Sequence, residues 1–258
     1  MIAASNKYLP ELNLFGMSDT GLKRSNNEDA FIARPEIGLC VVADGMGGAS
    51  AGELASGIFA ETASEIFSKA EPQVEQEVVE GVQHAFQLAN ERILNHARGN
   101  PDHRGMGCTA EILTFYHDNI ILGHVGDSRT YVLRKNALKQ LTKDHSLVQD
   151  QMDQGLITSI EARRHPLRHV ILRVVGVQAS LAVDIVRGKA MSGDLFLLCS
   201  DGLTDMVDDT TIQEVLSSSL GLSQKGARLV ELANTAGGYD NITVTLCEIG
   251  SIQQKPAD

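Results

Sequence analysis

Carboxylate side chains recur at the ends of apolar segments in this chain. In three places an apolar run is followed by an aspartate and a turn, and in a fourth an aspartate precedes such a run. These aspartates are Asp44, Asp127, Asp201 and Asp240. Glu28 and Asp29 form a further acidic pair beside another predicted strand. Asp and Gly are common where strands end, so each position alone is an ordinary turn signal. Together they favour a shared site.

Carboxylates that converge in a partly dry cleft repel one another, so either their pKa values rise or a cation neutralises them. The ligands on offer are all oxygens, from carboxylates and from backbone carbonyls of glycines such as Gly45. Oxygen ligands select hard cations such as Mg²⁺ and Mn²⁺ over zinc or copper. Several carboxylates suit two adjacent ions, which turn a bridging water into a nucleophile at neutral pH. The residues therefore predict metal-assisted hydrolysis.

Arg24 lies four residues before Glu28. An arginine beside an acidic cluster is often a salt-bridge partner. The alternative is a phosphate-binding role, because the guanidinium fork matches phosphate oxygens with two hydrogen bonds. That alternative makes a phosphoester the natural substrate class.

Helices and strands are expected to be grouped around these positions. Apolar residues at helical spacing predict helices over 50–70 and 73–98, and a third helical region covers 210–216 and 223–236. The predicted strands are 12–17, 38–43, 110–116, 120–125, 130–133, 181–186, 195–199 and 242–249. Hairpin turns are expected at Asp118-Asn119 and Lys135-Asn136, which favours antiparallel pairing. Runs such as 195–199 are apolar throughout, which indicates burial on both faces. The pattern predicts an α+β protein in which antiparallel sheets are stacked and covered by helices.

The rest of the chain adds no second domain. The 258 residues carry no repeat or linker, so one domain over 1–258 is expected, with a polar tail after 250. The polar segment of about 142–173 does not fit the sheets and is predicted to be an excursion from them.

Composition excludes several classes of protein. With 43% hydrophobic and 21% charged residues, the chain is an ordinary globular protein. Its net charge of −11 argues against general nucleic-acid binding, which depends on cationic contacts with phosphates. No apolar run approaches the ~20 residues of a membrane span, and no signal peptide is recognised. The four separated cysteines are expected to be buried thiols in a reducing cytoplasm, and a monomer is expected.

Other phosphate chemistries lack their motifs. A cysteine-based phosphatase needs an arginine six residues after its cysteine, and none of the four cysteines has one. The chain also lacks the Gly-x-x-x-x-Gly-Lys-Ser/Thr loop and the Gly-x-Ser-x-Gly elbow, and its histidines show no zinc spacing.

Six short motifs occur in order along the chain. They are Arg24-x-x-Asn27-Glu28-Asp29, Asp44-Gly45-Met46-Gly47-Gly48, Gly107-Cys108-Thr109-Ala110, Gly126-Asp127-Ser128-Arg129, Ser200-Asp201-Gly202-Leu203 and Asp240-Asn241-Ile242-Thr243. Each motif alone is weak, but the ordered set resembles the type-2C (PPM) metal-dependent Ser/Thr protein phosphatase family, bacterial type. The resemblance spans Gly21 to about Glu248.

The resemblance implies a four-layer αββα sandwich of two antiparallel β-sheets flanked by helix pairs, with a Mn²⁺ or Mg²⁺ site at one end. It assigns Asp44 to both ions and makes the Gly45 carbonyl a further ligand, with Glu28 on one ion and Asp201 and Asp240 on the other. In bacterial members a third ion can bind through the aspartate that matches Asp127, together with Asp201.

The resemblance also implies roles for two further residues. Arg24 matches the phosphate-binding arginine, and Asp29 matches an acid that orients metal-bound water. The implied reaction is direct attack of that water on phosphoserine or phosphothreonine, without a phosphoenzyme.

Two features depart from this pattern or extend it. Some members carry a histidine after the Asp-Gly pair as general acid, and here Met46 cannot donate a proton. A metal-bound water or a nearby histidine such as His145 could serve instead. The segment of about 142–173 matches the flap of bacterial members. It holds a dense basic cluster that either forms ordinary ion pairs or steers acidic phosphorylated segments: Arg163, Arg164, His165, Arg168, His169 and Arg173.

The sequence therefore favours a phosphatase of phosphorylated Ser/Thr proteins that opposes a bacterial-type kinase. Two alternatives stay open: a catalytically silent regulator that binds phosphoproteins, and a phosphatase of small phosphoesters. The presence of all four principal predicted ligands, Glu28, Asp44, Asp201 and Asp240, lowers the rank of the regulator.

Overall fold

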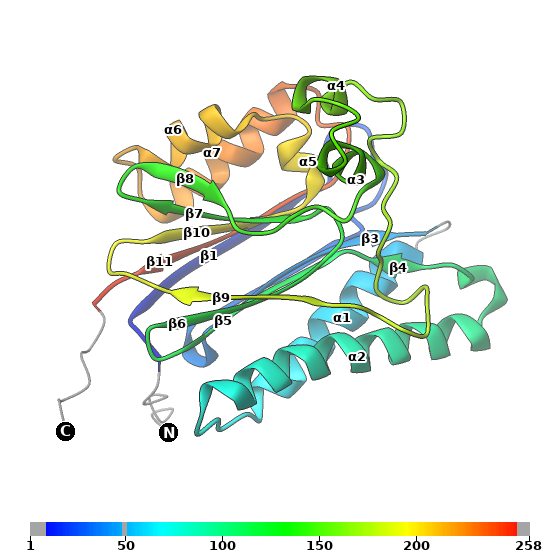
Figure 1. Cartoon of the computed structure of the whole chain (residues 1–258), viewed down its shortest axis with the longest axis horizontal. Coiled ribbons are helices and arrows are strands. Elements are labelled where there is room, and N and C mark those ends of the chain that lie inside the picture. The colour runs from blue at the N-terminus through cyan, green and yellow to red at the C-terminus, as the bar shows by residue number, and fades with distance from the viewer. Residues whose placement is uncertain (1–8, 48–50, 252–258) are drawn as a thin grey trace.

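Two antiparallel sheets pack face to face in the computed structural model, which describes residues 9–47 and 51–251 (Figure 1). The first sheet has the order β1-β11-β10-β7-β8, and the second β2-β3-β5-β6-β9. The strands of the first are β1 (Leu12–Asp19), β11 (Ile242–Ile249), β10 (Leu195–Cys199), β7 (Arg129–Arg134) and β8 (Ala137–Gln140). Those of the second are β2 (Asp29–Arg34), β3 (Leu39–Met46), β5 (Ala110–Tyr116), β6 (Asn119–Val125) and β9 (Asp184–Lys189). The short β4 (Gly107–Cys108) pairs with the end of β3.

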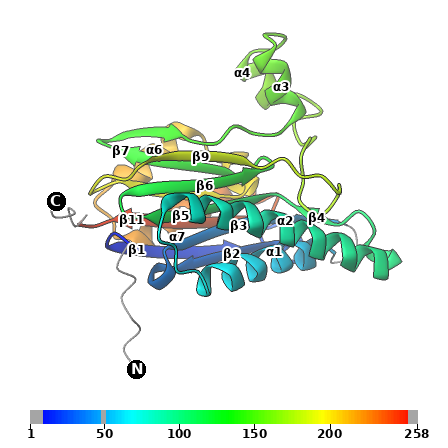
Figure 2. The same ribbon diagram turned by 60° about the horizontal axis from the view of Figure 1, so that its bottom comes forward.

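Helices cover the outer face of each sheet. The pair α1 (Ala51–Ser68) and α2 (Glu75–Gly99) packs on the second sheet. The pair α6 (Asp209–Ser217) and α7 (Leu222–Thr235) packs on the first. Figure 2 shows the resulting layers from a second direction. The α+β, four-layer prediction is confirmed.

Alternating side chains explain why the central strands are apolar throughout. In β10, Leu197 contacts the helix-facing core, whereas Phe196 and Leu198 face the core between the sheets. In β3, Val41 faces α1 and α2, whereas Val42 faces the other sheet. Each strand is therefore buried on both sides, and neither face can be polar.

Two details differ from the sequence-based expectation. β9 begins at Asp184 instead of residue 181, because Leu181 and Val183 pack against the α1/α2 core before the strand pairs with β6. The β5–β6 turn is formed by residues 117–118, one position earlier than expected. The β7–β8 turn at Lys135 and Asn136 is confirmed, with φ values of 51° and 61°.

The segment between β8 and β9 projects from the sheets and contains the short helices α3 (Leu147–Asp153) and α4 (Ser159–Arg163) (Figures 1 and 2). At its base, Leu147 N–H donates to the Val170 carbonyl at 2.9 Å. A capping box between Thr158 and Glu161 starts α4. We call residues 142–173 the flap.

The four cysteines, Cys40, Cys108, Cys199 and Cys247, are buried free thiols. Cys40 and Cys247 belong to the core between the sheets. Among the residues described, no helix combines the length and apolar character needed to cross a membrane.

Candidate active site

The predicted site residues gather at one end of the sandwich because strand ends from both sheets meet there. Antiparallel pairing of β2 and β3 places Asp29 directly opposite Asp44. Ser200, at the end of β10 in the other sheet, donates its hydroxyl to Asp29 Oδ2 at 2.8 Å. The next residue, Asp201, starts the short helix α5 (Asp201–Thr204).

These carboxylates lie close enough together to repel one another, and their pKa values rise as a result. Burial raises the pKa of the Asp44 carboxyl well above the usual range. Repulsion from four neighbouring carboxylates raises it further: Asp29, Asp201, Asp127 and Asp240. Burial and repulsion from several of the same residues likewise raise the pKa of Asp201 well above that of a free aspartate. Mutual repulsion of this kind calls for a neutralising cation.

Two further members of the cluster are similarly perturbed. Burial raises the pKa of Asp29 to about 6, against hydrogen bonds that lower it. Burial, followed by the charge of Asp144, raises the pKa of Asp127 to about 7. Without a cation, the site disfavours the ionised form of every one of these groups.

Unpartnered oxygens in the cluster fit a bound cation. Within residues 9–47 and 51–251, Oδ1 of Asp29, Asp127 and Asp201 is buried and accepts no hydrogen bond. Buried acceptors are rarely left unsatisfied, and a metal ion is one common reason. Because the whole donor set is oxygen, it suits Mg²⁺ or Mn²⁺.

Glu28 and Gly45 are held together by close backbone packing. Gly45 N–H donates to the Glu28 carbonyl at 3.1 Å. A Cβ on Gly45 would lie 2.2 Å from the Gly52 carbonyl oxygen of α1, and one on Gly52 would lie 2.7 Å from Glu28 Oε2. Only glycine allows this approach, which brings the Glu28 carboxylate beside the end of β3.

Asn241 is a positioning residue for which sequence reasoning gave no role. Its Oδ1 accepts from the Glu28 N–H at 2.8 Å, and its Nδ2 donates to the carbonyls of Thr20 and Asn26 at 2.9 Å each. One amide thus fixes the 20–28 loop against the start of β11. In the sequence, the Asp240-Asn241 motif predicted a metal-binding role for Asp240 and no role for Asn241.

Arg24 extends from this loop toward the cluster. Its Nη2 donates to Asp240 Oδ2 at 2.7 Å, and both side chains are partly exposed. Arg24 therefore forms a salt bridge, which was one of the two roles that the sequence suggested for it. Because the Arg24 side chain is about half-exposed, a phosphate could still reach its guanidinium, so a phosphate role is compatible with this contact.

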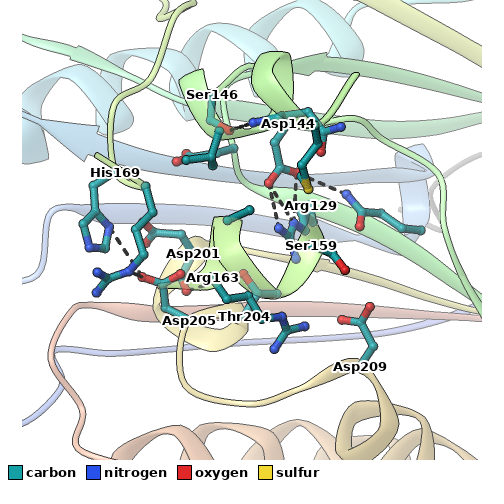
Figure 3. Close-up of a pocket in the computed structure, with 17 residues that line it drawn as sticks. Arg129, Asp144, Ser146, Ser159, Arg163, His169, Asp201, Thr204, Asp205 and Asp209 are labelled. Carbon is teal, nitrogen blue, oxygen red and sulfur yellow. Dashed lines mark hydrogen bonds and ion pairs between the residues drawn. The ribbon is translucent and has the colours of Figure 1, made fainter. Parts of the chain in front are cut away.

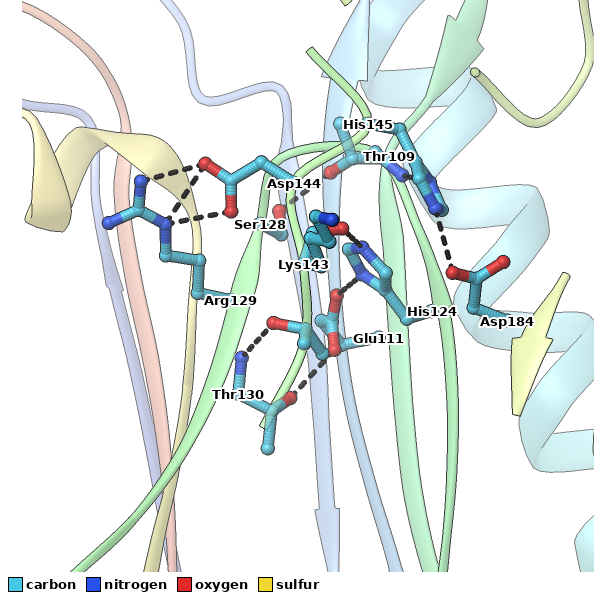
Figure 4. Close-up of polar contacts among 12 residues, drawn as sticks. Thr109, Glu111, His124, Ser128, Arg129, Thr130, Lys143, Asp144, His145 and Asp184 are labelled. Atoms are coloured by element: carbon cyan, nitrogen blue, oxygen red, sulfur yellow. Dashed lines mark hydrogen bonds and ion pairs between the residues drawn. The ribbon is translucent and has the colours of Figure 1, made fainter. Parts of the chain in front are cut away.

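His145 does not occupy the position of a proton donor. Its backbone N–H donates to the Gly126 carbonyl at 2.6 Å, and Gly126 N–H donates back to Nδ1 at 3.1 Å. Its Nε2 contacts Asp184 Oδ2 at 3.2 Å (Figure 4). Both ring nitrogens are thereby engaged, and the expectation that His145 could protonate a leaving group is not supported. Instead, His145 fixes the turn that carries Asp127.

A charged pair lies buried below this turn. Glu111 and His124 are hydrogen bonded to each other, and Glu111 Oε2 also accepts from Thr130 Oγ1 at 2.7 Å (Figure 4). Burial disfavours the imidazolium of His124, but Glu111 outweighs this and raises the His124 pKa to about 9. Burial also raises the pKa of Glu111. The pattern of the sequence gave no sign of this pair.

A cavity of about 280 Å³ separates the flap from the body, with Asp127 and Asp201 in its lining (Figure 3). From the flap side, Arg168 and His169 lie 4.0 and 3.5 Å from Asp205 Oδ2. Ligand atoms of His169, Asp201 and Asp205 lie within 4.8 Å of one another. The sequence places Asp201 and Asp205 four residues apart, but this spacing led to no prediction for Asp205.

The basic residues of the flap therefore fall into two groups, one paired with carboxylates and one exposed to solvent. Arg168 and His169 face Asp205, and Arg173 pairs with Asp184 at 2.8 Å, as ordinary ion pairs do. Arg163 and Arg164 are exposed.

Comparison with known proteins agrees with this geometry. The family model described as "Protein phosphatase 2C" matches residues 23–246. The chain belongs to the protein phosphatase 2C family. A serine/threonine phosphatase, stp, of Listeria welshimeri is 36% identical over 241 residues, which cover 92% of this chain and 96% of the relative.

Solved structures extend the family match to three dimensions. The Mycobacterium tuberculosis phosphatase PstP/Ppp superposes with a TM-score of 0.87 at 38% identity, covering 93% of this chain and 99% of that one. A catalytic domain of PstP in complex with two manganese ions superposes with a TM-score of 0.84 at 36% identity, covering 93% and 99%. The protein phosphatase 2C region thus includes every predicted site residue, from Arg24 to Asp240.

Proposed function

We propose that this chain is a metal-dependent phosphatase that hydrolyses phosphoserine and phosphothreonine in proteins. The observation that carries the proposal is the convergence of Asp29, Asp44, Asp127 and Asp201, all of which except Asp44 have a buried, unpartnered carboxylate oxygen. Arg24 stands beside this cluster, and the family membership and the named phosphatases among the relatives support the same activity.

The proposed cofactor is a pair of Mn²⁺ or Mg²⁺ ions. Asp44 would serve both ions, the Gly45 carbonyl would be a further ligand, Glu28 would hold one ion, and Asp201 and Asp240 the other. A third ion would use Asp127 together with Asp201. When bound, the ions would supply an activated water and neutralise the charge of the phosphate.

Side chains of this protein would bind the phosphate and orient the attacking water. Arg24 binds the phosphate oxygens and exchanges its contact with Asp240 for them. Asp29 is held by Ser200 through Oδ2, so its unpartnered Oδ1 accepts a hydrogen bond from the attacking water and orients it. Met46 lies next to Gly45 and has no acidic proton to donate, so the leaving serine or threonine oxygen would take its proton from a water molecule.

The biological setting follows from the same chemistry. The substrates are phosphorylated Ser/Thr proteins, including a bacterial-type Ser/Thr kinase or its targets, and the chain acts as a monomeric single catalytic domain. Four buried free thiols suit a reducing compartment, which supports a cytoplasmic location. The exposed Arg163 and Arg164 would let the flap attract acidic phosphorylated segments.

The experiment that tests the proposal is hydrolysis of a phosphothreonine peptide by the purified chain with Mn²⁺ and with EDTA. Asp201→Asn is compared in parallel. Activity that requires metal and is lost in Asp201→Asn is expected. Activity that survives EDTA would contradict the metal mechanism. Metal binding without any hydrolysis would favour the regulator that binds phosphoproteins. Hydrolysis of small phosphomonoesters alone would favour the phosphatase of small phosphoesters.

A further inference from the structure

A groove leads away from the end of β3, next to Gly45. It begins at Met46, which follows Gly45 directly, in a hollow of about 440 Å³ lined also by Gly105, Arg173 and Val177. A second hollow of about 520 Å³ shares Gly105 and Val177 and is lined also by Arg98. The two hollows adjoin at Gly105 and Val177, and Met46 in the first of them directly follows the proposed metal ligand Gly45.

The wall of this groove is built from the segment that follows the flap. Figure 1 shows that segment passing β4 and the C-terminal half of α2 before it enters β9. Val175 forms a two-way backbone bridge with Cys108, with N–O distances of 2.9 and 3.0 Å. A Cβ on Gly107 would lie 2.6 Å from the Val175 carbonyl oxygen, so glycine permits this approach.

Asn90 of α2 fixes the same wall from the other side. This buried residue accepts from Gly176 N–H at 2.6 Å and donates to the Gln178 carbonyl at 2.9 Å. An amide that bonds to positions 176 and 178 of this loop holds the intervening Val177 in place. These hydrogen bonds hold this wall of the groove against α2.

The near part of the groove exposes several apolar side chains to solvent, beside polar ones such as Arg173. Met46, Leu172 and Val177 are 39%, 49% and 44% exposed, although large apolar side chains are usually covered. They lie together in or beside the hollow next to Gly45. Apolar side chains of a bound partner would be sheltered there.

The far part of the groove is cationic. Arg98 and Arg104 line it and are exposed. Among the described residues, neither forms an ion pair with a carboxylate; Arg98 donates to Asn95 Oδ1 at 3.2 Å, and Asp102 lies in the same loop. In a chain with a net charge of −11, two unpaired arginines at the end of a groove are a local exception that suits an acidic ligand.

We infer that this groove, which we call the Met46–Arg104 groove, binds the chain of the phosphoprotein substrate. The favoured substrate has apolar residues next to the phosphorylated residue and acidic residues a few positions further along. This inference rests on the proposed function and specifies its substrate class. Groove contacts act on binding of the peptide, so they affect KM for peptides and leave the chemistry at the phosphate unchanged.

The test compares two phosphothreonine peptides and para-nitrophenyl phosphate, all with Mn²⁺. One peptide carries apolar flanking residues and an acidic end; the other carries Gly and Ser in their place. We expect Arg104→Glu and Val177→Asp each to lower kcat/KM for the apolar–acidic peptide by about tenfold, mainly through KM, as loss of about one good contact does. Hydrolysis of para-nitrophenyl phosphate stays within about twofold.

Matched variants control for charge and surface polarity. Lys139→Glu on β8 and Leu220→Asp before α7 change exposed residues outside the groove and should leave both substrates unaffected. Equal kcat/KM of the wild-type chain for the two peptides, with normal hydrolysis of para-nitrophenyl phosphate, would overturn the groove alone. Absence of hydrolysis of any of the three substrates would overturn the proposed function and the groove with it.

Discussion

Arg24 and Asp240 form an ion pair of 2.7 Å that joins the residue proposed to bind phosphate to a residue proposed to bind metal. Their side chains are 48% and 35% exposed. Ion pairs in such surroundings stabilise proteins by only ~0.2–1 kcal/mol, so Arg24 can leave Asp240 at little cost. A phosphate that approaches the ions therefore finds a guanidinium already in place and weakly held.

Replacing Arg24 should impair binding of every phosphate substrate. We expect Arg24→Ala to lower kcat/KM by about 10²-fold, and Arg24→Lys to recover only part of it, because an ammonium group lacks the planar fork. Steady-state kinetics with a phosphothreonine peptide measures both. The neighbouring exposed Lys23, changed to Ala, is the control. Wild-type kinetics in Arg24→Ala would rule out a phosphate role.

Neutralising one cluster carboxylate should stabilise the metal-free protein. In the absence of metal, Asp44 is repelled by four neighbouring aspartates. Asp44→Asn removes that repulsion, and we expect the free energy of unfolding in EDTA to rise by about 1–2 kcal/mol. Wild-type protein should gain further thermal stability on addition of Mn²⁺, because the ion binds only the folded state, whereas the variant should gain little.

Thermal and urea unfolding with and without Mn²⁺ measure these changes. Asp150→Asn in the flap is the control, since Asp150 lies on α3 away from the cluster and bonds only locally. A metal-free Asp44→Asn protein less stable than wild type would show that the repulsion is not the dominant effect.

The buried His124–Glu111 pair should make stability depend on pH. The folded-state pKa of His124 is raised from 6.5 to about 9, so its contribution is fully present below pH 6.5 and is lost as pH rises through about 9. The pKa of Glu111 is also raised above its ordinary value of 4.5, so its own contribution likewise falls as pH rises from that value. We expect the free energy of unfolding to fall by on the order of 1–3 kcal/mol across this window.

Urea titrations between pH 6.5 and 9.5 in EDTA measure that fall. The double variant Glu111→Gln and His124→Gln removes both titrations and should show a shallower decline. The single variant His124→Gln leaves Glu111 buried without its cation and should cost about 3–5 kcal/mol at pH 7.5. Equal pH dependence of wild type and double variant would contradict the assignment.

Loss of His145 should weaken binding of the ion that uses Asp127. His145 satisfies both backbone groups of Gly126, the residue before Asp127. Residues that orient a metal ligand affect metal affinity by about 10–100-fold, so His145→Ala should raise the Mn²⁺ concentration for half-maximal activity by that factor. His145→Asn, which offers an acceptor near the position of Nδ1, should restore part of the affinity.

Asp184→Asn provides the matched control, because an amide oxygen still accepts from His145 Nε2. Activity titrated against Mn²⁺ and direct calorimetric Mn²⁺ binding distinguish a metal effect from a general loss of structure. Unchanged Mn²⁺ affinity in His145→Ala would show that the Gly126 turn holds its shape by itself.

Periodicity and motifs in the sequence predicted the layers and most of the site. Apolar runs such as 195–199 must be buried on both faces, which requires a sheet with covers on both sides. Ordered Asp-Gly motifs located Asp44 and Asp201 at strand ends, because turns after buried strands favour those residues. These features depend on local spacing and so are readable from one chain.

Only the tertiary structure decided how distant residues combine. Asn241 bonds to Glu28, 213 positions away, and Asn90 reaches Gly176, 86 positions away. The engagement of both His145 nitrogens, which removes it as a proton donor, depends on how β6, β9 and the flap meet. Hydrogen bonds and charge pairs form between groups brought together by packing, and no spacing along the chain encodes their distance or direction.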